Sequence, residues 1–175
     1  MMKNNIYIEI DKDFEKDVDK NAIKRCSLKS LNIGSRDSCK DSISISITNS
    51  EKIKILNKKY LGKNFSTDVL AFPTMQNWSK GIENSKVKDN FNDEGHLGDI
   101  FISFENIVSQ SKLYMTGAEL ELNIILTHGI LHLLGYDHYD NNSKREMDNL
   151  TTDVIKNLSL DYKKAEISLG SRNER

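Results

Sequence analysis

Proline and cysteine are both scarce in this 175-residue chain, which has one proline and two cysteines, Cys26 and Cys39. Two cysteines make no disulfide framework, and these two lack the spacing of a metal site, so we expect free thiols in a reduced, cytosolic protein. Also missing is any run of about 20 apolar residues, the length that a bilayer-spanning helix needs. The first residues lead directly into a strand pattern, without the apolar region of a signal peptide.

An excess of charge of either sign is also absent. The chain has 25 basic and 26 acidic residues and a net charge of −1, which argues against a long electrostatic footprint on nucleic acid. A short footprint is compatible with this balance, because five lysines gather in one segment: Lys52, Lys54, Lys58, Lys59 and Lys63. They form either a solvated helix face, which is the commoner case, or a patch that contacts phosphate groups.

Strand and helix patterns are both present. Residues 42–47 alternate serine with isoleucine, which indicates a strand with one covered and one polar face. Similar reasoning predicts strands at 6–10, 42–47, 68–72 and 97–103, and helices at about 13–31, 50–62, 105–115, 116–134 and 143–158. We therefore expect an α+β fold with an about four-stranded mixed sheet and about five helices packed on it. A single domain would span residues 1–160, followed by a polar C-terminal tail at 161–175.

Several helix ends have recognisable capping residues. Gly34 and Gly62 are expected to end the first two helices. The candidate N-terminal caps are Ser50, the capping box of Thr116 and Glu119, and the capping box of Ser143 and Glu146.

A long segment, residues 74–96, is polar and without periodicity. A loop of this length is unusual in a compact domain and is either mobile or functional. Trp78 and Phe91 within it either pack the loop down or stack on nucleic-acid bases.

Three of the four histidines fall within eleven residues. His128 and His132 are four apart, so they share one face of the expected helix. Gly135 can end that helix in a left-handed turn, after which the reversed chain can bring His138 onto the same face. Three imidazoles would bind one zinc ion and leave a fourth position open, as in catalytic zinc sites.

The alternative is that these are ordinary core or surface histidines. Burying a polar ring without a partner costs on the order of 1–3 kcal/mol, and a shared metal would satisfy all three rings at once. Imidazole also suits nickel, copper and iron, so the residues alone do not identify the metal. His96, the fourth histidine, stands apart before a strand, and we expect it to be a surface or loop residue.

The spacing of the cluster, with a glycine three residues after the second histidine, is that of metzincin metalloproteases. In those enzymes a glutamate follows the first histidine directly and acts as general base. Here that position is Gly129. The metal-bearing helix is therefore metzincin-like as a scaffold, but a peptidase mechanism of that type lacks its base.

The segment HGILHLLGYDH, residues 128–138, resembles the signature of the YbeY family of bacterial endoribonucleases, also called rRNA maturation factors. LNKKY at 56–60, STDVLAFP at 66–73 and LGDI at 97–100 resemble further blocks of that family, and Glu119 fits as well. These segments run in order along more than half of the chain.

This resemblance implies a zinc-dependent endoribonuclease with His128, His132 and His138 as metal ligands. It would prefer single strands and act in the cytoplasm, in 16S rRNA 3′-end maturation and ribosome quality control. Single-stranded RNA, 16S rRNA, and the small ribosomal subunit or its assembly factors are the implied partners, with no membrane. The chain departs from the family at Leu61, where arginine is usual and would clamp phosphate, and at Ser66, where proline is usual.

The catalytic groups other than the metal ligands stay unassigned. A bound zinc would lower the pKa of water toward ~7 and polarise a phosphoryl oxygen, and attack by water or by the RNA 2′-OH are both compatible with it. Asp137 either orients a ligand or forms a turn, and Asp68 and Asp99 either hydrogen-bond a liganding histidine or fix a loop. Two other functions stay open: a metallohydrolase of another substrate class, and a non-catalytic ribosome assembly factor with a structural metal.

Overall fold

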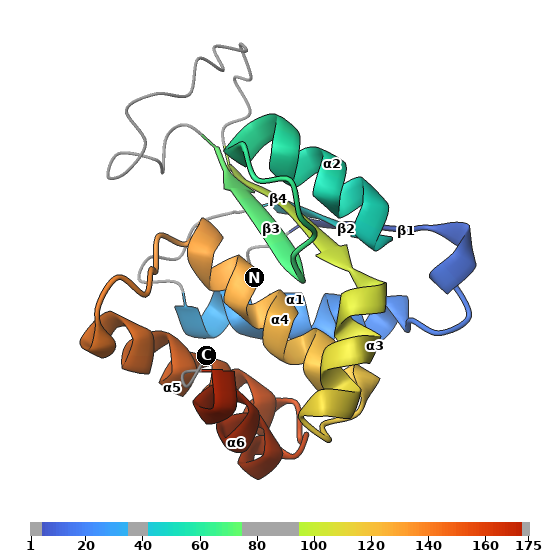
Figure 1. The fold of residues 1–175 in the computed structure, drawn as a ribbon. Helices are drawn as coiled ribbons and strands as arrows, with labels where there is room; N and C mark the ends of the chain where they lie inside the picture. Colours follow the sequence, from blue (N-terminus) through green and yellow to red (C-terminus); the bar gives the residue numbers. More distant parts are fainter. Residues whose placement is uncertain (1–4, 35–41, 75–94, 173–175) are drawn as a thin grey trace.

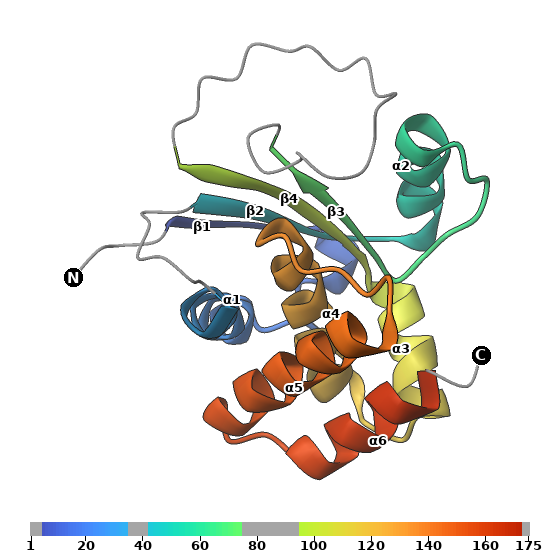
Figure 2. The same ribbon diagram turned by 90° about the vertical axis from the view of Figure 1, so that its left-hand side faces the viewer.

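A mixed four-stranded sheet forms one layer of the molecule, and most of the helices lie on one side of it (Figures 1 and 2). The computed structural model describes residues 5–34, 42–74 and 95–172. In the order β1-β2-β4-β3, only β3 runs antiparallel to its neighbour. The strands are β1 Asn5–Ile10, β2 Ser42–Thr48, β3 Val69–Pro73 and β4 His96–Ser103. The expected α+β class and mixed sheet are confirmed.

Six α-helices accompany the sheet in the described residues, one more than the sequence predicts. They are α1 Lys20–Gly34, α2 Ser50–Leu61, α3 Phe104–Leu113, α4 Ala118–Leu133, α5 Asn141–Asn157 and α6 Tyr162–Arg172. Figure 2 shows α1 and α4 next to the sheet, α5 and α6 beyond α4, and α2 across the strands from α4. A separate 3₁₀ turn, Lys12–Phe14, precedes α1, so the first predicted helix begins later than expected.

A polar tail was expected at 161–175, but the structure has the helix α6 at Tyr162–Arg172. Ala165 and Leu169 are buried in an apolar cluster with Leu120, Ile124 and Ile155, from α4 and α5. These two apolar residues of α6 are one helical turn apart and stand among charged neighbours, so the sequence shows little helical periodicity there. Within the described residues, no helix combines the length and the apolar character that crossing a membrane requires.

The N-terminal caps of α2 and α5 differ from those predicted. Asn49 caps α2 and accepts a hydrogen bond from the Lys52 backbone N–H at 2.9 Å, while Ser50 is the first helical residue. Asp140 caps α5 and forms a capping box with Ser143, one turn earlier than expected. The predictions were wrong by one and three residues because an asparagine or aspartate precedes each serine, by one residue in α2 and by three in α5, and serves equally well as a cap.

The predicted capping box of α4 is also wrong. Gly117, with φ of +83°, occupies the N-cap position and no side chain caps the helix. Thr116 instead donates its hydroxyl proton to the carboxylate of Glu121 at 2.9 Å. Glu119 lies in the first turn of α4, where a carboxylate interacts favourably with the helix dipole.

Helix α4 lies close to the sheet at Gly129, the position where the metzincin motif has its glutamate. A Cβ atom there would lie 3.2 Å from Cγ2 of Val69 and 3.3 Å from Cγ2 of Ile100. These atoms belong to β3 and β4, so a side chain at position 129 would point into the interface between helix and sheet. Packing of α4 against the sheet therefore explains the glycine at position 129 without reference to catalysis.

Replacement of Gly129 by glutamate should lower the free energy of unfolding by at least about 2 kcal/mol, because it overpacks this interface and buries a carboxylate. Urea unfolding of the two proteins measures the difference. Gly170→Ala is the matched control: a Cβ atom added there would meet no other part of the protein within 4 Å, so alanine in α6 should stabilise by up to about 1 kcal/mol. Wild-type stability of Gly129→Glu would contradict the packing argument.

Candidate metal centre

Three histidines converge where α4 ends. His128 and His132 lie one turn apart on α4, and Gly135, with φ of +86°, follows the helix as expected. The chain then reverses and brings His138 beside them, before α5. One ligand nitrogen from each ring can be chosen so that all three lie within 4.8 Å of one another. The predicted clustering is therefore present in the fold, and in the described residues this is the one group of its kind.

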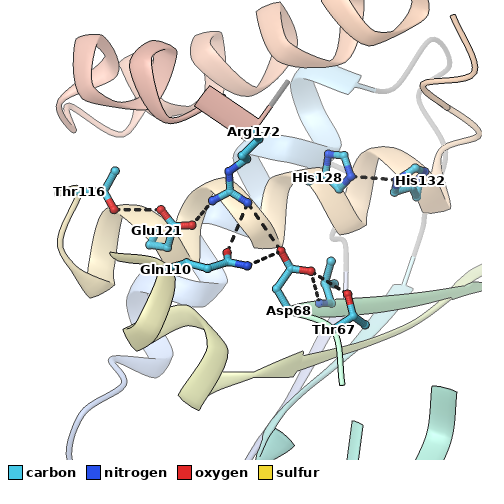
Figure 3. A network of polar contacts seen from close by, with 9 residues as sticks. Thr67, Asp68, Gln110, Thr116, Glu121, His128, His132 and Arg172 are labelled. Carbon is cyan, nitrogen blue, oxygen red and sulfur yellow. Dashed lines mark hydrogen bonds and ion pairs between the residues drawn. The ribbon is translucent and has the colours of Figure 1, made fainter. Parts of the chain in front are cut away.

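The His132 ring is oriented by the backbone. Its Nδ1 lies 3.0 Å from the carbonyl oxygen of Tyr136, and its Nε2 lies 3.0 Å from Nε2 of His128 (Figure 3). When Nδ1 donates its proton to that carbonyl, the lone pair of Nε2 faces the other rings. Two nitrogens on one tetrahedral zinc are about 3.3 Å apart, so this pair needs little adjustment to share an ion.

Burial keeps these imidazoles neutral. Burial first, and then the charges of His132 and His138, lower the pKa of His128 from 6.5 to about 3, against a smaller opposing effect of Asp68. Burial and His138 likewise lower the pKa of His132. Neutral imidazole is the form that binds metal, so both nitrogens are available well below neutral pH.

The histidines line an open cavity of about 1000 Å³. Its other walls come from β3, from the α2–β3 connection and from parts of α2, α4, α5 and α6. Lys63 and Lys144 bring positive charge to these walls, and Leu61 also lines the cavity, where the resemblance would favour arginine. The site is therefore accessible to a ligand larger than water.

Asp68, directly before β3, has its carboxylate fixed by neighbouring groups in the cavity wall (Figure 3). Its Oδ1 accepts hydrogen bonds from the hydroxyl of Thr67 and the backbone N–H of Val69, both at 2.9 Å. Its Oδ2 accepts from Nε2 of Gln110 at 3.3 Å and lies 3.6 Å from Nη1 of Arg172. Asp68 thus fixes a loop, one of its two predicted roles, and acts on His128 through its charge.

Arg172, at the end of α6, is the residue of this region that sequence reasoning missed. It forms an ion pair with Glu121, whose side chain is 0% exposed, and its guanidinium lies 4.9 Å from the centre of the Tyr114 ring. A glutamate within the apolar face of α4 was a signal that a buried cation must lie nearby. The pattern could not say which cation, because Arg172 is 51 residues away.

Other candidate residues lie apart from the histidine cluster or play local roles. His96 begins β4, and its ring lies 3.0 Å from Oγ of Ser42 and 3.3 Å from Oδ1 of Asp99. Asp99 therefore pairs with His96 and not with a ligand of the cluster. Asp137 accepts a hydrogen bond from the backbone N–H of His138 at 2.7 Å, which fits a turn residue.

The five lysines between residues 52 and 63 do not share one environment. Lys52 forms an ion pair with Asp11 at 2.9 Å, and Lys59 lies over the ring of Tyr60. Lys63 alone of the five lines the cavity. Trp78 and Phe91, predicted to pack or to stack on bases, lie outside the described residues, as does most of the segment 74–96.

Comparison with known proteins identifies similar chains. The family model described as Endoribonuclease YbeY matches residues 5–159. The Endoribonuclease YbeY of Thermodesulfovibrio yellowstonii is 40% identical over 117 residues, covering 66% of each protein. That of Alkaliphilus metalliredigens is 36% identical over 107 residues, 60% of this chain and 63% of the relative. That of Acetivibrio thermocellus is 39% identical over 121 residues, 68% of this chain and 74% of the relative.

The match therefore spans slightly less than two thirds of the length of the first two relatives. The solution structure of TM1509 from Thermotoga maritima has a TM-score of 0.55 and 20% identity, and the match covers 88% of this chain and 91% of that one. That likeness shows a shared fold. All of α6, including Arg172, lies beyond residue 159, where the match to the family model ends.

Replacing Arg172 by alanine should lower the free energy of unfolding by roughly 3–5 kcal/mol, because the Glu121 carboxylate is left buried without its cation. Denaturant unfolding measures this loss. The double variant Glu121→Gln with Arg172→Met should recover much of it, since position 121 then carries no buried charge and Asp68 keeps its hydrogen bonds from Thr67, Val69 and Gln110. A loss below about 1 kcal/mol for Arg172→Ala would contradict the ion-pair interpretation.

The metal-free protein should lose stability as the pH falls below about 6.5. His128 has a pKa of about 3 when folded and near 6.5 when unfolded, so between these values only the unfolded state binds its proton. One such proton lowers the free energy of unfolding by about 1.4 kcal/mol per pH unit, and above pH 6.5 the effect vanishes. Urea unfolding between pH 7.5 and 4.5 should give a shallower slope for His128→Gln, and equal slopes would refute the assignment.

Proposed function

The chain belongs to the YbeY family of endoribonucleases, and on that premise we propose that it is a metal-dependent endoribonuclease that cleaves single-stranded RNA. Its proposed task is 16S rRNA 3′-end maturation and ribosome quality control in the cytoplasm, with the small ribosomal subunit or its assembly factors as partners. The observation that carries the proposal is the convergence of three histidine ligand nitrogens within 4.8 Å at an open cavity.

The proposed cofactor is one zinc ion held by His128, His132 and His138. Three imidazoles, one oriented through its Nδ1 by a backbone carbonyl, are a donor set that fits zinc. When bound, the ion would supply Lewis acidity toward a phosphodiester oxygen and toward water. The chain's own contribution is to keep His128 neutral by burial and to place lysine side chains in the walls that a phosphate backbone would pass.

The two alternative functions receive less support. A metzincin-type peptidase needs a general base directly after the first histidine, and a side chain at Gly129 would point into the sheet. A purely structural metal is expected to be closed off by four protein ligands, whereas His138 is exposed and the cavity is open. The site therefore favours a catalytic role with an accessible coordination position.

Replacing His132 by alanine should abolish both stoichiometric zinc binding and RNA cleavage, because two imidazoles hold the ion too weakly. Metal analysis after dialysis and cleavage of an unstructured RNA oligonucleotide measure the two properties. His96→Ala removes the histidine that lies outside the cluster, and it should keep both. Cleavage by His132→Ala at the wild-type rate, or wild-type cleavage in excess chelator, would overturn the proposal.

A further inference from the structure

Two exposed aromatic side chains line the cavity of the histidine cluster. Phe65, in the α2–β3 connection, is 57% exposed, and Tyr139, between α4 and α5, is 82% exposed. Each has a lysine of the same cavity nearby in the chain: Lys63 lies two residues from Phe65, and Lys144 lies five residues from Tyr139. Two separate segments of the wall therefore each contribute an aromatic residue and a lysine that are close in sequence.

The backbone that carries Phe65 is held in place although its ring lies in solvent. Asn57 is buried, and its side-chain amide donates a hydrogen bond to the carbonyl oxygen of Phe65 at 2.8 Å. The neighbouring Ser66 accepts a hydrogen bond from the amide of Asn106 at 3.1 Å. At the start of the connection, Gly62 has a left-handed φ of +72° and ends α2. The exposure of Phe65 is thus a property of a fixed loop.

Tyr139 is restrained in a similar way. It directly follows His138, and the nearby Asp137 carboxylate raises the pKa of its hydroxyl. The Asp137 side chain also accepts from the backbone N–H of His138. The ring of Tyr139 therefore belongs to the same short turn as a histidine of the cluster.

We propose that Phe65 and Tyr139 form a binding site for unpaired RNA bases on either side of the phosphate at the histidine cluster, with Lys63 and Lys144 facing the neighbouring phosphates. The proposal rests on the endoribonuclease function proposed above and names how that site recognises its substrate. Aromatic side chains stack on any base, so the site selects strands without selecting sequence. Bases in a duplex are already stacked on one another, so the same rings select single strands.

The test is a binding measurement that does not depend on cleavage. A mixed-sequence 2′-O-methyl oligonucleotide, single-stranded or folded as a hairpin duplex, is titrated with the full chain in the presence of chelator. Phe65→Ala and Phe65→Leu should each weaken binding of the single strand by roughly five- to a hundredfold, the range expected for one lost stacking contact. Phe65→Tyr should bind like wild type, and the hairpin should bind weakly and equally to all variants.

The matched control is Tyr7→Ala. Tyr7 is 59% exposed and lies on β1, away from the residues that line the histidine cavity. The Tyr7→Ala variant should bind both oligonucleotides as wild type does. Because the rings of Phe65 and Tyr7 are both exposed, thermal unfolding of Phe65→Ala and Tyr7→Ala should match that of wild type.

Each contrary result has a distinct meaning. Unchanged single-strand binding by Phe65→Ala, or full binding by Phe65→Leu, would overturn the stacking site. Binding that depends on Phe65 in a protein that never cleaves RNA would refute the proposed function and leave the base site standing. Cleavage of single strands with no effect of Phe65 would refute the base site alone.

Discussion

The rest of the site depends on the desolvation of imidazoles at the end of α4. An imidazole in water is partly protonated near neutral pH, and a proton on the ligand nitrogen competes with a metal ion. Burial lowers the pKa of His128 to about 3 and that of His132 in the same direction. The fold thus prepares lone pairs that point toward one another, an arrangement that is unfavourable unless a cation or a shared proton lies between them.

That desolvation is produced by the packing of α4 and not by the histidines themselves. Gly129 lets the helix lie close to β3 and β4, and α6 covers another side through Ala165 and Leu169. The ion pair of Arg172 with Glu121 joins α6 to α4, and its contact with Asp68 extends to the cavity wall (Figure 3). A helix that lies entirely outside the part matched by the family model therefore contributes to the surroundings of the histidine cluster.

Features set by local sequence were predicted well. The alternation of residues 42–47 identified β2, and the spacing of His128 and His132 with Gly135 after them identified the clustered histidines. Features set by contacts between distant segments were not predictable. Arg172 pairs with a residue 51 positions away, and α6 is stabilised by apolar residues of other helices more than by its own pattern. The cap positions of α2 and α5 were predicted wrongly for a different reason, since polar residues within one turn of each other compete for the same cap.

X-ray absorption spectroscopy of the zinc-loaded chain tests the metal centre most directly, because it reports the ligand atoms around the ion. If the three histidines hold zinc and leave one position open, the spectrum will contain imidazole scattering from three rings, with nitrogen or oxygen neighbours at about 2.0–2.1 Å. Sulfur neighbours, a shell of oxygen alone, or failure of the chain to take up zinc would contradict this structure of the site.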